Sequence, residues 1–258
     1  MNRIAIYTCV TGNYDSLHSP GVWDPDVDYI CFAPSHCRIE GVEGWKVRTF
    51  DYVGETMQET SRFPKLNPHI VLPDYEYSLW IDGNVTITSH ELIDIVKRKI
   101  DSGVLYSGIR HPRGGDIYEE AMRCLRGKRD SFRNIFRSVR FLKREGFPAG
   151  IPVMENNVVL RKHLDPAIIE TDCLWWQLYM KYSRRDQLSL MYCLEKNSIP
   201  LDLLIPEGYS AKNWPGLHLY RHKKSTKKNT SGVRKSIDEY IHKIPKAFLR
   251  LYISTFIK

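Results

Sequence analysis

The sequence predicts an α/β protein built as a single domain around a mostly parallel β-sheet. Short apolar segments with strand character alternate along the chain with segments whose apolar residues recur at helical spacing. This alternation is typical of a parallel sheet covered by helices. The 258 residues, 42% hydrophobic and 26% charged, suffice for a sizeable core and exclude disordered, collagen-like and coiled-coil proteins.

Four strands are expected in the first third of the chain. The apolar run at residues 4–10 ends in a Thr-Gly-Asn turn, which predicts the first strand. β-Branched and aromatic residues predict two more strands at 28–33 and 45–50. A fourth strand is expected at 77–81, where an apolar run lies between Pro-Asp and Asp-Gly-Asn.

The rest of the body alternates in the same way. Apolar residues at helical spacing predict a helix over about 91–100. The remaining expected elements are, in order, a strand at 104–109, a basic helical region at 116–144 with a break near Gly127, a strand at 157–160, and helical segments at 174–180 and 187–194.

Positive charge is concentrated in a C-terminal tail. The net charge is +8, but residues 221–258 hold 11 Lys/Arg and 2 Asp/Glu, which leaves residues 1–220 close to neutral. A neutral body argues against nucleic acid as a partner. The tail begins with a linker and continues as a basic amphipathic segment over 237–258, a pattern typical of a helix lying on an anionic membrane surface. A helix packed on the body is the alternative.

The lengths of the apolar runs and the spacing of the cysteines predict where the protein is located and how its cysteines behave. No apolar run approaches the roughly 18 residues that a membrane-spanning helix needs, and residues 4–10 lack a signal-peptide pattern. We therefore expect a cytoplasmic protein, peripheral at the inner face of the membrane. The six cysteines show no CxxC or paired Cys/His spacing, so buried thiols are expected.

The segment Trp80-Ile81-Asp82-Gly83-Asn84 carries the strongest chemical signal. Ligands of open α/β sheets bind beyond the carboxyl ends of strands, which is where this segment is expected. Side chains two apart on a strand point the same way, and Asp82 and Asn84 offer oxygen ligands to Mg²⁺ or Mn²⁺. Gly83 would let a ligand approach the backbone. A simple Asp-Gly-Asn turn is the alternative.

A basic cluster precedes that segment. Arg62, Lys65 and His69 would share one face of a helix, where their charge would neutralise phosphates. Pro64 and Pro68 limit how much regular helix is possible here. A solvated basic face is the alternative.

Two further segments follow expected strands or helices. His111 and Arg113 come directly after the strand at 104–109, where a loop and helix start is the alternative. Asp186 lies between Arg185 and Gln187, so its carboxylate is a candidate to lie near a sugar's reacting carbon. A surface ion pair or a helix N-cap is the alternative for Asp186.

The order of these segments resembles one family. The chain contains TGNYD, then RFPKLNPHIVLP, WIDGN, HPRGGDIYEEA and RRDQLS. Together they resemble the TOD/MUCI-type glycosyltransferase-like family, whose pattern includes TGxYD, RxxKxxPHxxLP, WIDGN, HPxR with YxEA, and RDQ. The resemblance extends from residue 4 to about residue 221.

The resemblance implies a GT-A-like, Rossmann-like fold and a nucleotide-sugar donor. It places Asp82 and Asn84 at the usual DxD metal site for Mn²⁺ or Mg²⁺, with His218 or His222 completing the metal shell. Asn84 departs from the second acid of that motif and is a neutral, weaker ligand. The donor-binding residues that it implies are Thr8, Thr11, Gly12, Tyr14, Arg62, Lys65, Asp82, Gly83, Asn84, His111 and Arg113.

The expected activity is transfer of a sugar from a nucleoside diphosphate sugar to a hydroxyl of a surface-glycan or lipid-linked acceptor. Asp186 would lie near the anomeric carbon or the acceptor hydroxyl, Gln187 would hydrogen-bond the donor sugar, and Arg185 would lower the pKa of Asp186. The alternatives are an inactive nucleotide- or sugar-binding protein of the same fold and a metal-dependent nucleotidyltransferase.

Overall fold

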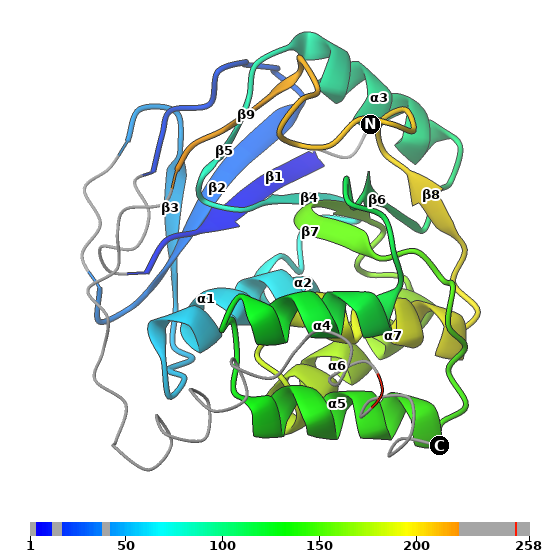
Figure 1. The fold of residues 1–258 in the computed structure, drawn as a ribbon. Helices are drawn as coiled ribbons and strands as arrows, with labels where there is room; N and C mark the ends of the chain where they lie inside the picture. The colour runs from blue at the N-terminus through cyan, green and yellow to red at the C-terminus, as the bar shows by residue number, and fades with distance from the viewer. Residues whose placement is uncertain (1–3, 12–16, 38–41, 222–250, 252–258) are drawn as a thin grey trace.

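Seven strands form the central sheet of the protein (Figure 1). The structure is a computed structural model that describes residues 4–11, 17–37, 42–221 and 251. The strand order is β3-β2-β1-β4-β7-β6-β8. The strands are β1 (Ile4–Cys9), β2 (Val27–Pro34), β3 (Lys46–Phe50), β4 (Ser78–Ile81), β6 (Tyr106–Arg110), β7 (Met154–Arg161) and β8 (Leu201–Leu203).

The sheet is mostly parallel, as the sequence predicts. Every neighbouring pair in it is parallel except the two pairs that β7 makes with β4 and β6. The chain runs from β1 outward through β2 and β3 and then returns to β4 on the other side of β1. This reversal opens a crevice at the carboxyl ends of β1 and β4, where ligands of open α/β sheets bind.

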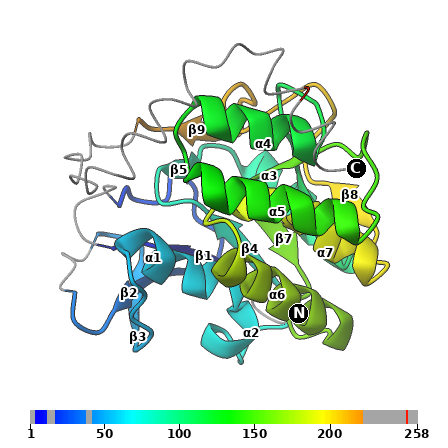
Figure 2. The ribbon, with the colours of Figure 1, turned by 60° about the horizontal axis from the view of Figure 1, so that its bottom comes forward.

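Different layers cover the two faces of the sheet (Figures 1 and 2). One face carries α3 (His90–Asp101) and a small ladder of β5 (Val85–Ile87) with β9 (Leu217–Leu219). The other carries the remaining helices, which are α1 (Met57–Leu66), α2 (Pro68–Val71), α4 (Ile117–Arg126), α5 (Phe132–Arg144), α6 (Pro166–Lys181), the 3₁₀-helix η1 (Asp186–Leu188) and α7 (Leu190–Lys196).

Strand alternation divides the apolar residues between two cores. In β1, Ala5 and Tyr7 belong to the core beneath the larger helical layer, whereas Ile4 and Ile6 belong to the core beneath α3. All six residues of β1 are buried because both faces of the sheet are covered. The continuous apolar run at the start of the chain therefore matches a central parallel strand.

The expected elements are confirmed, with differences at their ends. The helical region at 116–144 is two helices, α4 and α5, and the break near Gly127 is confirmed. The strand at 157–160 begins earlier, in β7, and the segment at 174–180 is the second half of α6. All six cysteines are free thiols, and Cys9, Cys31, Cys124 and Cys193 are buried.

Helix α1 is the main element that the sequence did not establish. Thr56 caps it by accepting a hydrogen bond from the Glu59 backbone amide at 3.1 Å. The helix accommodates Pro64 inside its last turn.

The tail at 221–258 lies outside the described residues except for 221 and 251, so its amphipathic helix and membrane contact stay predictions. In the part of the chain that the structure describes, no helix combines the length and apolar character needed to span a bilayer.

A buried ion pair ties the sheet to the helical layer. The Arg161 guanidinium, on β7, donates to the Asp172 carboxylate of α6 at 2.7 Å, and both side chains are fully buried. Arg161 also donates to the Tyr7 hydroxyl of β1 at 2.9 Å and to the main-chain carbonyl of Lys65 in α1. One guanidinium thus fixes four elements around the carboxyl end of α1.

We expect Asp172→Ala to lower the free energy of unfolding by about 3–5 kcal/mol, because it leaves the Arg161 charge buried without its partner. Lys99→Ala is the control: it removes a partly exposed ion pair of similar length, with Lys99 Nζ 2.6 Å from Asp202 Oδ2. The control should cost about 1 kcal/mol or less. Urea unfolding monitored by circular dichroism measures both, and equal losses would contradict the account.

Candidate active site

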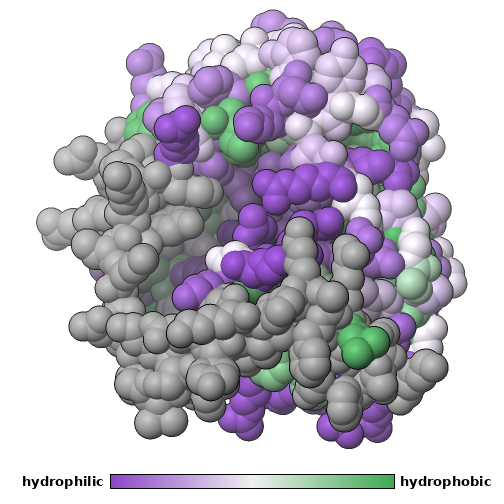
Figure 3. Space-filling model, viewed as in Figure 1, coloured by the Kyte–Doolittle hydropathy of each residue, from purple (hydrophilic) through white to green (hydrophobic). Residues whose placement is uncertain are grey.

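A cleft of about 740 Å³ lies at the carboxyl ends of β1 and β4. Its volume is in the range of small-molecule sites. Hydrophilic side chains surround the hollow near the middle of the face in Figure 3. The described residues that line the cleft are Cys9, Val10, Thr11, Met57, Gln58, Ser61, Arg62, Lys65, Trp80, Asp82, Gly83, His111, Lys128, Arg129, Glu155, Asn156, Asn157, Arg185, Asp186 and Gln187.

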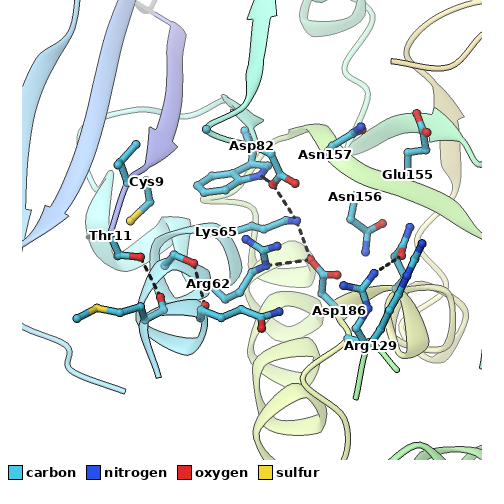
Figure 4. A pocket seen from close by; sticks show the side chains of 18 of the residues that line it. Cys9, Thr11, Arg62, Lys65, Asp82, Arg129, Glu155, Asn156, Asn157 and Asp186 are labelled. Atoms are coloured by element: carbon cyan, nitrogen blue, oxygen red, sulfur yellow. Dashed lines mark hydrogen bonds and ion pairs between the residues drawn. The ribbon is translucent and has the colours of Figure 1, made fainter. Parts of the chain in front are cut away.

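The Lys65 ammonium group lies between two carboxylates in this cleft (Figure 4). Its Nζ is 2.7 Å from Asp186 Oδ2 and 3.4 Å from Asp82 Oδ1, and the side chain is 1% exposed. Arg62 joins the cluster with Nε 3.4 Å from Asp186 Oδ2. The Trp80 indole donates to Asp82 Oδ1 at 2.8 Å. Four charged groups from three segments thus form one network.

Local structure explains why these side chains meet. Trp80 is in β4 and Asp82 is two residues further on, so strand alternation directs both towards the helical layer. Arg62 and Lys65 are three apart on α1 and share the face turned towards the sheet. Asp186 starts η1, where its main-chain carbonyl accepts a hydrogen bond from the Trp175 indole at 2.9 Å.

The cluster is held in its ionised form. Burial alone would raise the pKa of Asp186, but the charges of Lys65 and Arg62, and then Arg185, outweigh burial and hold that pKa well below its usual range. For Asp82, burial is likewise outweighed by Lys65 and Arg62, so its pKa is lowered. Burial lowers the pKa of Lys65, and the two carboxylates oppose that effect. Two cations therefore balance two anions.

The loop that carries Arg185 and Gln187 is tied down on both sides. Arg185 donates to the Gln187 side-chain oxygen at 3.1 Å, and the Gln187 amide donates to the Met154 carbonyl at 3.2 Å. Ahead of this loop, the Asp130 carboxylate accepts from the Ser183 hydroxyl at 2.7 Å and from the Arg184 amide at 2.9 Å. Asp186 is consequently a buried network member, and the alternative of a surface ion pair does not apply.

The structure brings most of the expected site residues into one cleft. From the donor-binding and catalytic sets, the cleft is lined by Thr11, Arg62, Lys65, Asp82, Gly83, His111, Arg185, Asp186 and Gln187. Thr8 is buried within β1, Arg113 is exposed in the loop after β6, and neither lines the cleft. Gly12, Tyr14 and His222 lie outside the described residues.

Asn84 and His218 do not line the cleft, and the expectation that Asp82 and Asn84 point the same way is wrong. The strand ends at Ile81, and a turn follows in which the Val85 amide donates to the Asp82 carbonyl at 2.8 Å. Beyond a turn, strand alternation no longer applies. The Asn84 side-chain amide instead donates to the Tyr220 carbonyl at 2.9 Å.

His218 and His69 are also placed elsewhere. His218 is in β9, paired with Thr86 of β5, and its ring packs edge-on against Tyr220. His69 is in α2, beyond the end of α1, with Nε2 3.8 Å from Cys173 Sγ. The prediction of a shared helix face is therefore confirmed for Arg62 and Lys65 but is wrong for His69.

Three neighbouring residues of β7 that were not predicted as site residues, Glu155, Asn156 and Asn157, line the cleft as an amide-rich wall (Figure 4). The register between β6 and β7 shifts at this place, so residues 156–158 have no partner on β6. Such bulges re-aim side chains next to active sites. Asn156 is 4% exposed, and neither polar atom of its amide has a hydrogen-bond partner among the described residues. The sequence feature that could have identified this wall is the pair of consecutive asparagines inside an otherwise apolar strand.

Two basic residues of the cleft were missed as well. Lys128 and Arg129 follow α4, in the loop where the sequence predicts only a helix break. Both are exposed, and Arg129 Nη1 is 3.5 Å from Glu120 Oε1. Their positive charge thus faces the cleft from the side opposite α1.

The comparisons with known proteins identify the family. Residues 40–204 match the model of the "TOD1/MUCI70, glycosyltransferase-like domain" family, and the chain belongs to this family. The matched range contains Lys65, Asp82, Asn156 and Asp186. The α/β fold with its mostly parallel sheet agrees with the fold that the resemblance implied.

One curated relative is "Probable hexosyltransferase MUCI70" of Arabidopsis thaliana. It is 28% identical over 148 residues, which cover 54% of this chain and 25% of the relative. The chain therefore spans about a quarter of the length of that protein.

Two solved structures show a limited similarity to this chain. Mouse xyloside xylosyltransferase 1, in its apo form, has a TM-score of 0.44 and 10% identity over 78% of this chain and 84% of that chain. The apo structure of WbbM, a bifunctional glycosyltransferase, has a TM-score of 0.43 and 12% identity over 78% of this chain and 38% of that chain. At these values neither structure bears on the substrate of this protein.

We expect Asn156→Leu to leave the free energy of unfolding unchanged or to raise it by about 1–3 kcal/mol, because the substitution removes a buried amide without partners. The matched control is Asn67→Leu: Asn67 is also 4% exposed, but its amide donates to the Phe63 carbonyl at 3.0 Å. The control should be destabilised by about 1–3 kcal/mol. Urea unfolding distinguishes the two, and an equal loss at Asn156 would show that this amide has a structural role.

Proposed function

We propose that this domain transfers a sugar from a nucleoside diphosphate sugar to a hydroxyl group of a glycan acceptor. The observation that carries the proposal is the Lys65–Asp82–Asp186 cluster inside a cleft at the switch point of a parallel sheet. Membership of a glycosyltransferase-like family supports the reaction class.

The lining of the cleft suggests how such a donor would lie in it. The segment from Cys9 to Thr11, at the end of β1, would contact the nucleoside, as ligands at a switch point do. The cationic side chains of the cleft would face the diphosphate. Asn156, with its unpartnered amide, and Gln187 would offer hydrogen bonds to the hydroxyls of the donor sugar.

In the proposed reaction, the bond between the anomeric carbon and the diphosphate oxygen breaks while the acceptor oxygen bonds to that carbon. Negative charge grows on the leaving diphosphate, and fixed cations stabilise it. Asp186 is a weak base because its pKa is held well below the usual range, so its role is to hold Lys65 and to stabilise positive charge at the anomeric carbon.

The proton of the acceptor hydroxyl needs a better base, and we assign this role to Glu155. Glu155 is one of the residues that line the cleft, and burial, followed in smaller part by the charge of Asp82, raises its pKa. A raised pKa makes a carboxylate a stronger base near neutral pH. One oxygen accepts a hydrogen bond from the Ala211 amide at 2.9 Å, which fixes the orientation of the carboxylate.

Thermal-shift measurements with a panel of nucleoside diphosphates and nucleotide sugars test the function. We expect one nucleotide class to raise Tm by about 5–10 °C at a hundredfold excess over its Kd, since ligand binding stabilises only the folded state. A shift with free sugars and with no nucleotide would contradict the proposal and favour a sugar-binding protein of this fold.

We expect Glu155→Gln to lower kcat by about 100-fold or more, because it removes the base. In the wild-type protein, activity should fall as the pH drops through the pKa of Glu155 and the carboxylate becomes protonated. Because that pKa is raised, this loss begins at a higher pH than for an ordinary glutamate. The variant should lack this acid limb. Asp202→Asn, at a carboxylate of β8 outside the cleft, is the control. A wild-type kcat in Glu155→Gln would exclude Glu155 as the base.

A further inference from the structure

We propose that the cleft binds its diphosphate donor without a divalent metal ion, using fixed cationic side chains for the charge neutralisation that a metal ion provides elsewhere. This inference rests on the proposed function, because it concerns the same donor. It is carried by the surroundings of Asp82, by the placement of Asn84 and His218, and by the balance of charge in the cleft.

Asp82 is already engaged with other groups. Its Oδ1 accepts a hydrogen bond from the Trp80 indole at 2.8 Å and lies 3.4 Å from Lys65 Nζ. A divalent cation bound to this carboxylate would lie close to Lys65 and near Arg62, which acts on Asp82 through its charge. Repulsion between cations is strong at a partly buried position because water and salt screen it poorly. The Lys65 ammonium thus takes the place of a metal ion beside Asp82.

Asn84 and His218 do not complete a metal site with Asp82, and His222 lies outside the described residues. Asn84 uses its side-chain amide to hold the Tyr220 carbonyl, and its own main-chain carbonyl accepts from the Tyr220 amide at 2.8 Å. Its position is thereby fixed against the segment that follows β9. His218 is within β9 and does not line the cleft. Among the residues that the structure describes, no three His, Cys, Asp or Glu side chains are grouped to hold a metal ion.

The charge of the cleft matches a diphosphate without additional ions. Its described lining contains the cationic side chains of Arg62, Lys65, Lys128, Arg129 and Arg185 and the carboxylates of Asp82, Glu155 and Asp186, a surplus of two positive charges. A nucleoside diphosphate sugar carries about two negative charges, one on each esterified phosphate. A resident divalent cation would leave an excess of positive charge.

The surplus comes from one side of the cleft. Lys65 and Arg62 are paired with Asp82 and Asp186, so the cations that these two carboxylates do not pair are on the opposite side. Among them, Arg129 has its carboxylate partner, Glu120, outside the lining of the cleft. Lys128 and Arg129 reach the cleft from the loop after α4, and Arg185 precedes η1. We therefore place the diphosphate against this second group, within reach of the Lys65 ammonium.

Isothermal titration calorimetry with UDP and GDP, in EDTA and then with Mn²⁺, tests the inference. We expect the better-bound nucleotide to show the same Kd within about twofold in both conditions. Binding that appears only with Mn²⁺, or that tightens at least tenfold with it, would overturn the inference and leave the proposed function standing. No binding of any nucleotide in either condition would overturn both.

A variant pair locates the binding site in the same assay. Lys128→Ala/Arg129→Ala, at two exposed positions of the cleft, should weaken binding in EDTA at least tenfold. Arg126→Ala/Arg133→Ala removes the same charge from exposed helix positions that do not line the cleft and should leave Kd unchanged. Equal weakening in both variants would indicate general charge attraction and contradict the assigned site.

Discussion

The contact between the Lys65 ammonium and two carboxylates is the interaction on which the rest of the site depends. A buried cation is tolerated only when its charge is paired, and here the partners come from the end of β4 and the start of η1. Arg161 holds the main chain of the same lysine from β7. Removing Lys65 would leave the buried Asp186 carboxylate close to the partly buried Asp82 carboxylate, so the segments that shape the cleft are mutually dependent.

Much of the fold follows from local patterns that the sequence displays. Continuous apolar runs such as residues 4–10 identify central parallel strands, and helical spacing identifies α3. The site residues at strand ends were found for the same reason, since β4 is recognisable and Asp82 follows it. Asp186 and Lys65 were found as separate motifs. Their contact joins residues 121 positions apart and depends on tertiary packing, which no local pattern encodes.

The remaining features depend on geometry that breaks a local rule. Asn84 follows a turn, so strand alternation fails for it and its amide holds the segment after β9. Asn156 lines the cleft at a register shift that only the pairing of β6 with β7 reveals. Pro64 obscured helix α1, although Thr56 caps its start. These three departures from local sequence rules lie at or next to the cleft. Functional sites are where such rules are most often broken, because the site fixes the geometry of its residues.

A crystal structure of the protein with its nucleotide sugar, grown in EDTA, tests the central claim most directly. We predict a diphosphate hydrogen-bonded to Arg185 and to the Lys128–Arg129 loop, with the sugar against Asn156 and without a metal ion at Asp82. A ligand in the second hollow, which lies beside β3 and is lined in part by Phe50 and Phe63, would contradict this prediction. A second crystal, grown with a divalent metal ion, would also contradict it if the diphosphate contacted Asp82 only there and only through that metal ion.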